Sequence, residues 1–333
     1  MLSIGVCTDL AAWDEQVVAF GGNPLQLAGW GELKAAHGWR ALRLEVRDDA
    51  AGTPVVALAQ VLVRPLPGMF RALCHVPRGP VMAPGTSIAD RSAVCDAIAV
   101  YARAQVGGVG ITFEPDWPAA DPLTITGAVP SPNPIFMAET LILDLALDDD
   151  TLLAQMAKKT RYEVRKSQRS EWDITPVTTE ADLADVLTLY RTTSERAGFG
   201  IHSDGYYRDV HTLLGQHSLL LLARMDGEPV AFLWIVESGT TGIDLYGGSN
   251  DAGRKALANY ALKWSAIKYL RERGVTRYDL NGLLGDDVSA FKRGFANHTD
   301  TLVGSIDVPF SMWYSAWNKA LPAAKKVVRR LRG

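Results

Sequence analysis

The sequence predicts an α/β fold made of two successive units of similar plan. Apolar runs of strand length, such as 54–64 and 218–225, alternate with segments whose apolar residues recur every three or four positions, as in helices. The order of strands and helices is repeated after about residue 151, although the two halves share little sequence. At 333 residues the chain also exceeds the ~250–300 residues at which a single core stops growing. We therefore expect a first domain over 1–148 and a second domain after it.

The composition is that of a globular protein. The chain is 47% hydrophobic and 21% charged, with a net charge of −3, so a polyanion would have to meet a local basic patch. Cys7, Cys74 and Cys95 lack metal-ligand spacing, and we expect free thiols in a reducing cytoplasm, with no metal site and no disulfide framework. No signal peptide or membrane span is predicted, because the N-terminus lacks a basic region and the apolar runs are strand-sized.

One segment of the first half matches the sequence pattern of a cofactor-binding loop. Gln105-Val-Gly-Gly-Val-Gly110 fits the Q-x-x-G-x-G pattern that holds the pyrophosphate of coenzyme A. Such a loop must lead from a strand into a helix N-terminus, so that free amides face the phosphates. Here it leaves a helix predicted at 91–105 and enters a strand predicted at 110–114. We interpret it as a turn and predict no cofactor.

The segment 244–292 carries the most informative pattern. A strand ends in Gly247-Gly248, and a helix over 256–274 follows with apolar residues at spacings of three and four. A second strand, 277–280, ends at Asn281-Gly282, and a loop then carries Phe291-Lys292-Arg293. Strand, helix and strand with such a loop at the exit are typical of an α/β acyltransferase.

A helix that begins near Thr151 is strongly basic. Within twelve residues it carries six cations: Lys158, Lys159, Arg161, Arg165, Lys166 and Arg169. Arg161, Arg165 and Arg169 share one face, and such like-charged pairs cost a few tenths of a kcal/mol each. Two interpretations stay open, a solvated helix face or a surface that binds the phosphates of a polyanion.

Several short motifs together resemble the Fem family (FemABX). Tyr246-Gly247-Gly248-Ser249, Trp264 in mid-helix, Tyr278-Asp279-Leu280-Asn281-Gly282 and Phe291-Lys292 follow in order over about fifty residues, and Gln26, Trp30 and Lys34 match a further motif. The resemblance covers the chain from Gln26 to its end. It implies an α/β fold of two tandem GNAT-like (acyl-CoA N-acyltransferase-like) domains, with mixed twisted sheets flanked by helices and an internal duplication. The second domain would span 149–306, and 307–333 would pack back on the first.

Fem enzymes move an amino acid from aminoacyl-tRNA to the stem peptide of a peptidoglycan precursor. The resemblance therefore implies a cytoplasmic aminoacyltransferase of cell wall biogenesis. Its partners would be aminoacyl-tRNA, as co-substrate, and lipid II or UDP-MurNAc-pentapeptide. The first domain would bind the precursor and the second the tRNA end. The basic, amphipathic end of the chain would permit peripheral contact with the inner membrane surface, with a frayed tail as the alternative.

The resemblance also implies roles for particular residues. Lys292 would donate to the carbonyl oxygen on which charge develops, with Arg293 as the alternative donor. Phe291 would stack on the terminal adenosine, and Tyr246, next to Gly247 and Gly248, would hydrogen-bond a substrate. Lys34 beside Trp30 would bind precursor phosphates, unless it is a solvated charge beside a core aromatic. Four cations would contact tRNA or precursor phosphate: Lys158, Arg161, Arg165 and Lys166.

Two positions depart from the family pattern. Glu114 stands where the family usually has aspartate before a proline, so it is either the catalytic carboxylate that orients the amine or a solvated strand end. His202 stands four residues before Tyr206, where the family commonly has a phosphate-binding arginine, and imidazole binds phosphate less well than a guanidinium. His202 and Tyr206 remain candidates for substrate binding.

Three other functions remain open at this point. The first is a coenzyme-A-dependent N-acyltransferase on the same fold, which would need a pyrophosphate loop. The second is the same tRNA-dependent chemistry directed at a secondary metabolite. The third is a non-catalytic cell-wall scaffold, in which Lys292 would be dispensable.

Overall fold

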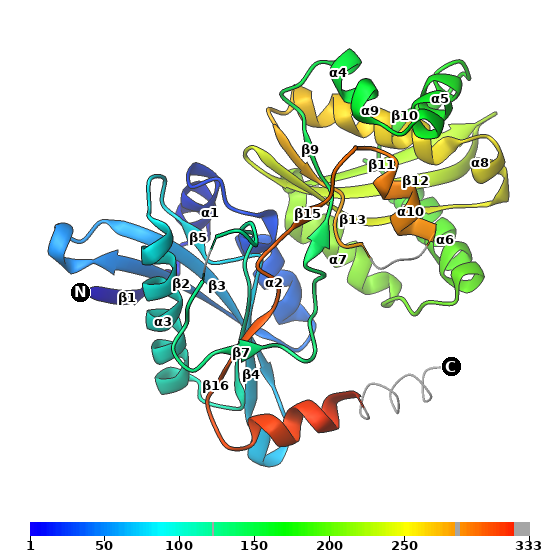
Figure 1. The fold of residues 1–333 in the computed structure, drawn as a ribbon. Coiled ribbons are helices and arrows are strands. Elements are labelled where there is room, and N and C mark those ends of the chain that lie inside the picture. Colours follow the sequence, from blue (N-terminus) through cyan, green and yellow to red (C-terminus); the bar gives the residue numbers. More distant parts are fainter. Residues whose placement is uncertain (122, 284–286, 323–333) are drawn as a thin grey trace. The chain divides into compact units, whose positions relative to one another are not determined.

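The computed structural model describes residues 1–121, 123–283 and 287–322, and it divides into two compact units. Unit 1 contains Met1–Ala138 and the chain from Thr301 onward, and unit 2 contains Glu139–Asp300 (Figure 1). The predicted α/β fold with two units of similar plan is confirmed. In the described part of the chain, no helix has the length and apolar character needed to cross a membrane.

Unit 1 is built on an eight-stranded sheet in the order β1-β2-β3-β4-β6-β16-β7, with β5 paired to β3. All pairings are antiparallel except that of β4 with β6, in which Leu73 lies opposite Gly110 and Pro77 opposite Glu114. The strands are β1 (Leu2–Val6), β2 (Arg40–Asp48), β3 (Val55–Pro65), β4 (Ala72–Pro77), β5 (Val81–Met82), β6 (Gly110–Glu114), β7 (Val129–Pro130) and β16 (Ile306–Pro309).

Helices cover both faces of this sheet. They are α1 (Leu10–Ala19), α2 (Ala28–Ala36) and α3 (Ile88–Gln105), with short 3-10 turns at Pro24–Gln26, Asp49–Ala51 and Gly68–Phe70. Ala57, Ala59 and Val61 of β3 pack with α3, whereas Leu58 packs with Trp13 of α1. Because both faces of β3 are buried, its sequence is a continuous apolar run rather than an alternating one.

Unit 2 is built on a six-stranded sheet in the order β10-β11-β12-β13-β14-β9. Its strands are β9 (Ile142–Asp144), β10 (Asp173–Pro176), β11 (Ser218–Met225), β12 (Glu228–Ser238), β13 (Thr241–Ser249) and β14 (Arg277–Asp279). Its helices are α4 (Asp149–Gln155), α5 (Lys158–Ser167), α6 (Glu180–Ala197), α7 (Asp204–Leu214), α8 (Asp251–Lys255), α9 (Ala258–Glu272) and α10 (Asp287–Arg293), with a 3-10 turn at Gly215–His217. Asp226 and Gly227 join β11 to β12 with positive φ angles, as a tight hairpin turn requires.

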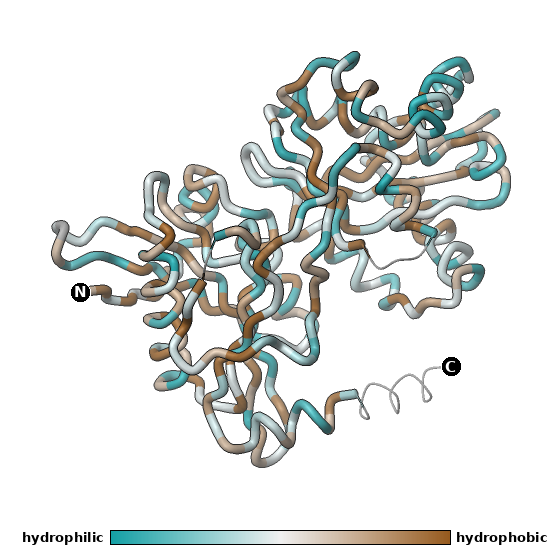
Figure 2. The backbone as a smooth tube through the Cα atoms, in the orientation of Figure 1, coloured by the Kyte–Doolittle hydropathy of each residue, from teal (hydrophilic) through white to brown (hydrophobic). Residues whose placement is uncertain are grey.

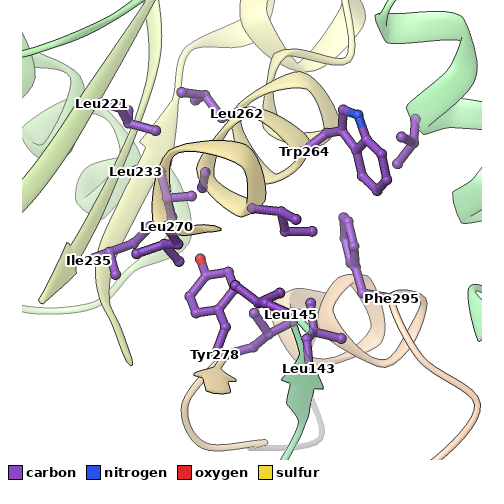
Figure 3. Packing of buried hydrophobic residues seen from close by; sticks show 14 of the residues in the cluster. Leu143, Leu145, Leu221, Leu233, Ile235, Leu262, Trp264, Leu270, Tyr278 and Phe295 are labelled. Atoms are coloured by element: carbon purple, nitrogen blue, oxygen red, sulfur yellow. The ribbon is translucent and has the colours of Figure 1, made fainter. Parts of the chain in front are cut away.

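The core of unit 2 lies mainly between α9 and its sheet. Figure 3 shows Leu262, Trp264 and Leu270 of α9 facing side chains from the strands and Phe295. The hydropathy of the chain agrees with this core, because the sheet strands are largely hydrophobic and α5 is strongly hydrophilic (Figure 2).

β13 and β14 separate after a short parallel pairing. They pair only over Thr241–Ile243 and Arg277–Asp279, and β13 then continues to Ser249. A register shift opposite β12 leaves Leu245 without a partner there, because Trp234 faces Tyr246 and Ile235 faces Asp244. The carboxyl ends of the two strands therefore form an opening in the sheet, which we call the β13–β14 opening.

The structure corrects three details of the predicted organisation. The predicted strand 139–147 belongs to unit 2, because β9 pairs with β14; β8 (Glu139–Thr140) instead pairs with β15 (Asp300–Thr301). Residues 301–306 belong to unit 1, where Leu302 bridges to Pro118. The boundaries are thus 138/139 and 300/301 rather than 148/149 and 306/307, and Phe291 to Arg293 lie in a helix, not a loop. The predicted turn at 105–110 joins α3 to β6 as expected.

Candidate active site

Lys292 lies at the β13–β14 opening in unit 2. Its Nζ donates hydrogen bonds to the carbonyl oxygens of Asn281 (2.9 Å) and Gly282 (3.2 Å), just beyond the end of β14. The Asn281 side chain in turn donates to the carbonyl oxygen of Asp244 on β13, at 3.0 Å. Asn281 adopts φ 60°, a left-handed conformation that asparagine tolerates better than most residues. The half-buried ammonium of Lys292 is therefore fixed relative to both strands.

A buried ionic network lies next to it. Lys263 of α9 is only 2% exposed, and its Nζ donates to the Asp244 carboxylate and to the Tyr278 hydroxyl oxygen (2.9 Å). Tyr278 also donates to Asp244. Burial lowers the pKa of Lys263 despite the opposing effect of Asp244, and the charge of Lys292 lowers it further. The network ties α9, β13 and β14 together around the opening.

Aromatic side chains gather around Tyr246 of β13. Its ring contacts Tyr190 (5.7 Å between centroids), Tyr207 (5.2 Å) and Trp234 (5.8 Å). His202 stacks on Tyr206 with ring centroids 4.0 Å apart. Burial raises the pKa of Tyr206 to about 12, so this hydroxyl is neutral. The predicted residues His202, Tyr206 and Tyr246 thus belong to one aromatic cluster.

The two predicted glycines have mainly a packing role. A Cβ at Gly248 would lie 2.6 Å from the Thr193 hydroxyl of α6 and 2.7 Å from the Phe232 ring, so α6 can approach β13 only because this residue is glycine. Gly247 is exposed, and a Cβ there would meet nothing closer than 3.5 Å.

Phe291 and Arg293 flank Lys292 but make other contacts. Phe291 packs against Tyr260 (5.0 Å) and Phe295 (5.1 Å). Arg293 pairs with Glu139 at 3.1 Å on the surface. Phe291 therefore helps to fix α10 on α9, a use that competes with its predicted stacking on adenosine.

The basic helix α5 lies directly beside α10. The amide of Ala157 donates to the Gly294 carbonyl at 2.9 Å, and a Cβ at Gly294 would lie 2.1 Å from the Thr160 hydroxyl. Four cations within α5 are exposed together with Tyr162, and Arg169 just beyond its end is exposed too; the four are Lys158, Lys159, Arg165 and Lys166. Arg161 instead donates to the carbonyls of Leu153 and Ala154 (3.4 Å each), so it caps α4 rather than extending the exposed row.

In unit 1, Glu114 is held by donors on all sides. It is 1% exposed and accepts hydrogen bonds from the amides of Ile135 (2.7 Å) and Phe136 (3.0 Å) and from the Ser305 hydroxyl, and it pairs with His75 Nε2 at 2.7 Å. Burial raises the pKa of Glu114, but the His75 interaction and the other hydrogen bonds outweigh it and hold the pKa at about 2. This geometry conflicts with the predicted role as catalytic carboxylate and equally with a solvated strand end, because a general base needs access and a pKa near the working pH.

Lys34 and Trp30 lie on one face of α2. The Lys34 ammonium sits 4.3 Å from the centre of the buried Trp30 ring. Burial, with a smaller contribution from the charge of Arg64, lowers the pKa of Lys34 to about 8. Gln26, the first residue of the same motif, is fully buried and donates to the Pro77 carbonyl at 2.6 Å.

Sequence reasoning missed Asp244, Lys263 and His75. Of these residues, Lys263 could have been found from the sequence, because it stands between Leu262 and Trp264 on the buried side of α9. Within the described residues, no group of three or more His, Cys, Asp and Glu could hold a metal ion. The predicted basic tail from Lys325 lies outside those residues.

Comparison with known proteins shows similarity in both sequence and fold. Residues 154–293 match a model described as an acetyltransferase (GNAT) domain. The lipid II:glycine glycyltransferase of Staphylococcus aureus is 22% identical over 86% of this chain and 88% of its own length. A crystal structure of FemX matches with a TM-score of 0.79 at 20% identity, covering 92% of this chain and 97% of FemX. A tandem GNAT protein from the clavulanic acid pathway matches with a TM-score of 0.53 at 13% identity, covering 93% and 99%.

The two units thus form a tandem GNAT-like fold, the architecture of an acyltransferase. The chain is thus similar over most of its length to a lipid II:glycine glycyltransferase in sequence and to FemX in fold, and both similarities support the predicted resemblance to the FemABX family.

Proposed function

We propose that the protein transfers an amino acid from aminoacyl-tRNA to the stem-peptide amine of a peptidoglycan precursor. The observation that carries the proposal is the Lys292 ammonium, fixed at the β13–β14 opening beside the basic helix α5. The relationship to a lipid II:glycine glycyltransferase supports the choice of acceptor. Unit 2 would receive the tRNA end and unit 1 the precursor.

The reaction is the aminolysis of an ester. The acceptor nitrogen forms a bond to the ester carbonyl carbon, and negative charge develops on the carbonyl oxygen. The bond from this carbon to the ribose oxygen then breaks, and the proton lost by the amine ends on the ribose hydroxyl. In this proposal Lys292 donates to the carbonyl oxygen, where a preorganised donor stabilises the transition state more than the ground state.

The exposed cations of α5 supply the contact with tRNA. Lys158, Lys159, Arg165 and Lys166 project from the helix that packs on α10. Cations that bind phosphate position a nucleic acid without reading its sequence. Such contacts would bring the aminoacyl end toward Lys292 whichever amino acid it carries.

The experiment is transfer from a pool of tRNA charged with labelled amino acids to two acceptors, UDP-MurNAc-pentapeptide and lipid II. We expect label on at least one acceptor, and analysis of the labelled product identifies the transferred amino acid. Preference for lipid II would agree with peripheral contact at the inner membrane surface. No label on either acceptor contradicts the proposal.

A coenzyme-A-dependent N-acyltransferase is the second candidate, because the matching domain model describes an acetyltransferase. The Q-x-x-G-x-G segment does not support it, since it connects the end of α3 to the start of β6. Acetyl-coenzyme A should therefore leave the melting temperature unchanged; a rise of several degrees would favour this second function.

A further inference from the structure

Arg78 is a buried cation in which two guanidinium nitrogens lack a hydrogen-bond partner. The residue is 2% exposed, and its Nε and Nη2 atoms are buried with no hydrogen-bond acceptor among the described residues. Its guanidinium lies over the Phe136 ring, 4.9 Å from the ring centre. Buried arginines are ordinarily paired with an anion, because taking an unpaired charge out of water is costly.

The Glu114 carboxylate, at the end of the neighbouring strand β6, already has other partners. Arg78 follows β4 directly, and Pro77 lies opposite Glu114 in the parallel β4–β6 pair. The Glu114 carboxylate is occupied by His75, Ser305 and the amides of the 135–136 segment. His75 also stacks near Phe136, at 6.1 Å. Glu114 therefore forms its hydrogen bonds with His75, Ser305 and the 135–136 amides, and Arg78 is not among its partners.

The backbone around Arg78 is fixed by the motif that contains Lys34. Gln26 donates to the Pro77 carbonyl (2.6 Å) and accepts from the Gln60 amide (2.7 Å). A Cβ at Gly79 would lie 2.6 Å from the Gln26 side chain, so the turn packs closely on it. Arg78 has φ 49°, a conformation that non-glycine residues rarely adopt. A strained backbone and an unsatisfied side chain at one position are typical of ligand sites.

We propose that Arg78 binds an anionic group of the acceptor substrate, either a phosphate or a carboxylate. Both present two oxygens to the guanidinium fork. Arg78 lies at the end of the sheet where β4 and β6 finish, and the half-buried Phe136 ring covers its guanidinium. The inference deepens the proposed function, on which it rests, by assigning a residue for acceptor binding in unit 1.

The test is the binding affinity of wild-type protein and of R78Q, R78M and R78K for three probes, without tRNA. UDP-MurNAc-pentapeptide carries both anions, UDP carries only phosphates, and the free stem pentapeptide carries only the carboxylates. We expect R78Q and R78M to bind the full precursor about 10- to 100-fold more weakly, as for lost hydrogen bonds to charged groups. R78K should lose less, because it keeps the charge without the fork. The smaller probe whose affinity falls identifies the anion.

Arg71 provides the matched control. It flanks the other end of β4, also has a positive φ of 59°, and is exposed. R71Q should bind all probes as the wild type does. Melting temperatures without ligand give a second readout: removal of an unpaired buried charge should leave the melting temperature of R78M unchanged or higher.

Unchanged affinity in R78M overturns the inference. If the melting temperature of R78M also falls by several degrees, Arg78 has a structural role instead. A wild-type protein that binds none of the probes overturns it as well. Arg78-dependent binding of the precursor without any transfer of label would instead contradict the proposed function and leave the anion site standing.

Discussion

Replacing Lys292 with methionine removes the proposed donor while keeping most of the side-chain volume. Removal of one donor to a developing oxyanion costs about 10²- to 10³-fold in kcat, roughly 3–4 kcal/mol. Folding is affected as well. Lys292 donates hydrogen bonds to the carbonyls of Asn281 and Gly282, and each contributes about 1–2 kcal/mol at a half-buried position that water can reach. Their sum, about 2–4 kcal/mol, should lower the melting temperature by about 4–16 °C.

R293M is the matched control for K292M. Arg293 is the next residue, carries the same charge, and forms an exposed pair with Glu139, worth about 0–1 kcal/mol. The assay is the steady-state rate of amino acid transfer, with circular dichroism to verify folding. R293M should keep the wild-type kcat within a few-fold. A folded K292M enzyme with near wild-type kcat would refute the role of Lys292, as would an equal loss in R293M.

Three further predictions concern the other parts of the two units. Changing Lys158 and Lys166 to glutamine should raise KM for aminoacyl-tRNA and weaken its salt dependence, whereas R161Q should mainly lower stability because Arg161 caps α4; equal effects on KM would contradict this division. Because the pKa of Lys34 is lowered to about 8, precursor affinity should fall as pH rises from 7 to 9, and K34R should abolish that dependence; the same pH profile in K34R would exclude Lys34 as its source. The Glu114 pKa of about 2 lies below its ordinary 4.5, so the carboxylate contributes stability above pH 4.5, about 3 kcal/mol, that is lost as pH falls toward 2. E114Q should thus unfold at lower urea at pH 7, with the gap narrowing below pH 4; a constant gap would argue against this ion pairing.

The sequence predicted the fold because its signals were local. The apolar runs of β3 and β11 and the periodicity of α9 depend on neighbouring residues, and strong patterns of this kind determine secondary structure. The domain boundaries were displaced because they depend on pairing between distant segments. β9 joins β14 across more than 130 residues of sequence, and no local pattern distinguishes this pairing from one in unit 1.

The site was predictable only in part, for a similar reason. The motif residues Lys292, Tyr246 and Tyr206 could be selected by their order in the chain, and the structure places the first at the β13–β14 opening and the other two in one aromatic cluster. The use of each side chain depends on partners far away in sequence. The Glu114 carboxylate is occupied by His75 and Ser305, and Arg161 turns back to α4. Neither contact could be predicted from the residue types alone.

The most direct test of the account is transfer of labelled amino acid from charged tRNA to UDP-MurNAc-pentapeptide and lipid II, before and after the tRNA is digested with ribonuclease. The account predicts label on an acceptor with intact charged tRNA, and its loss after digestion. Undiminished transfer from the digested sample would show that the tRNA body and the basic helix α5 have no part. Absence of transfer with every amino acid present would contradict the central claim that this chain is an aminoacyl-tRNA-dependent transferase.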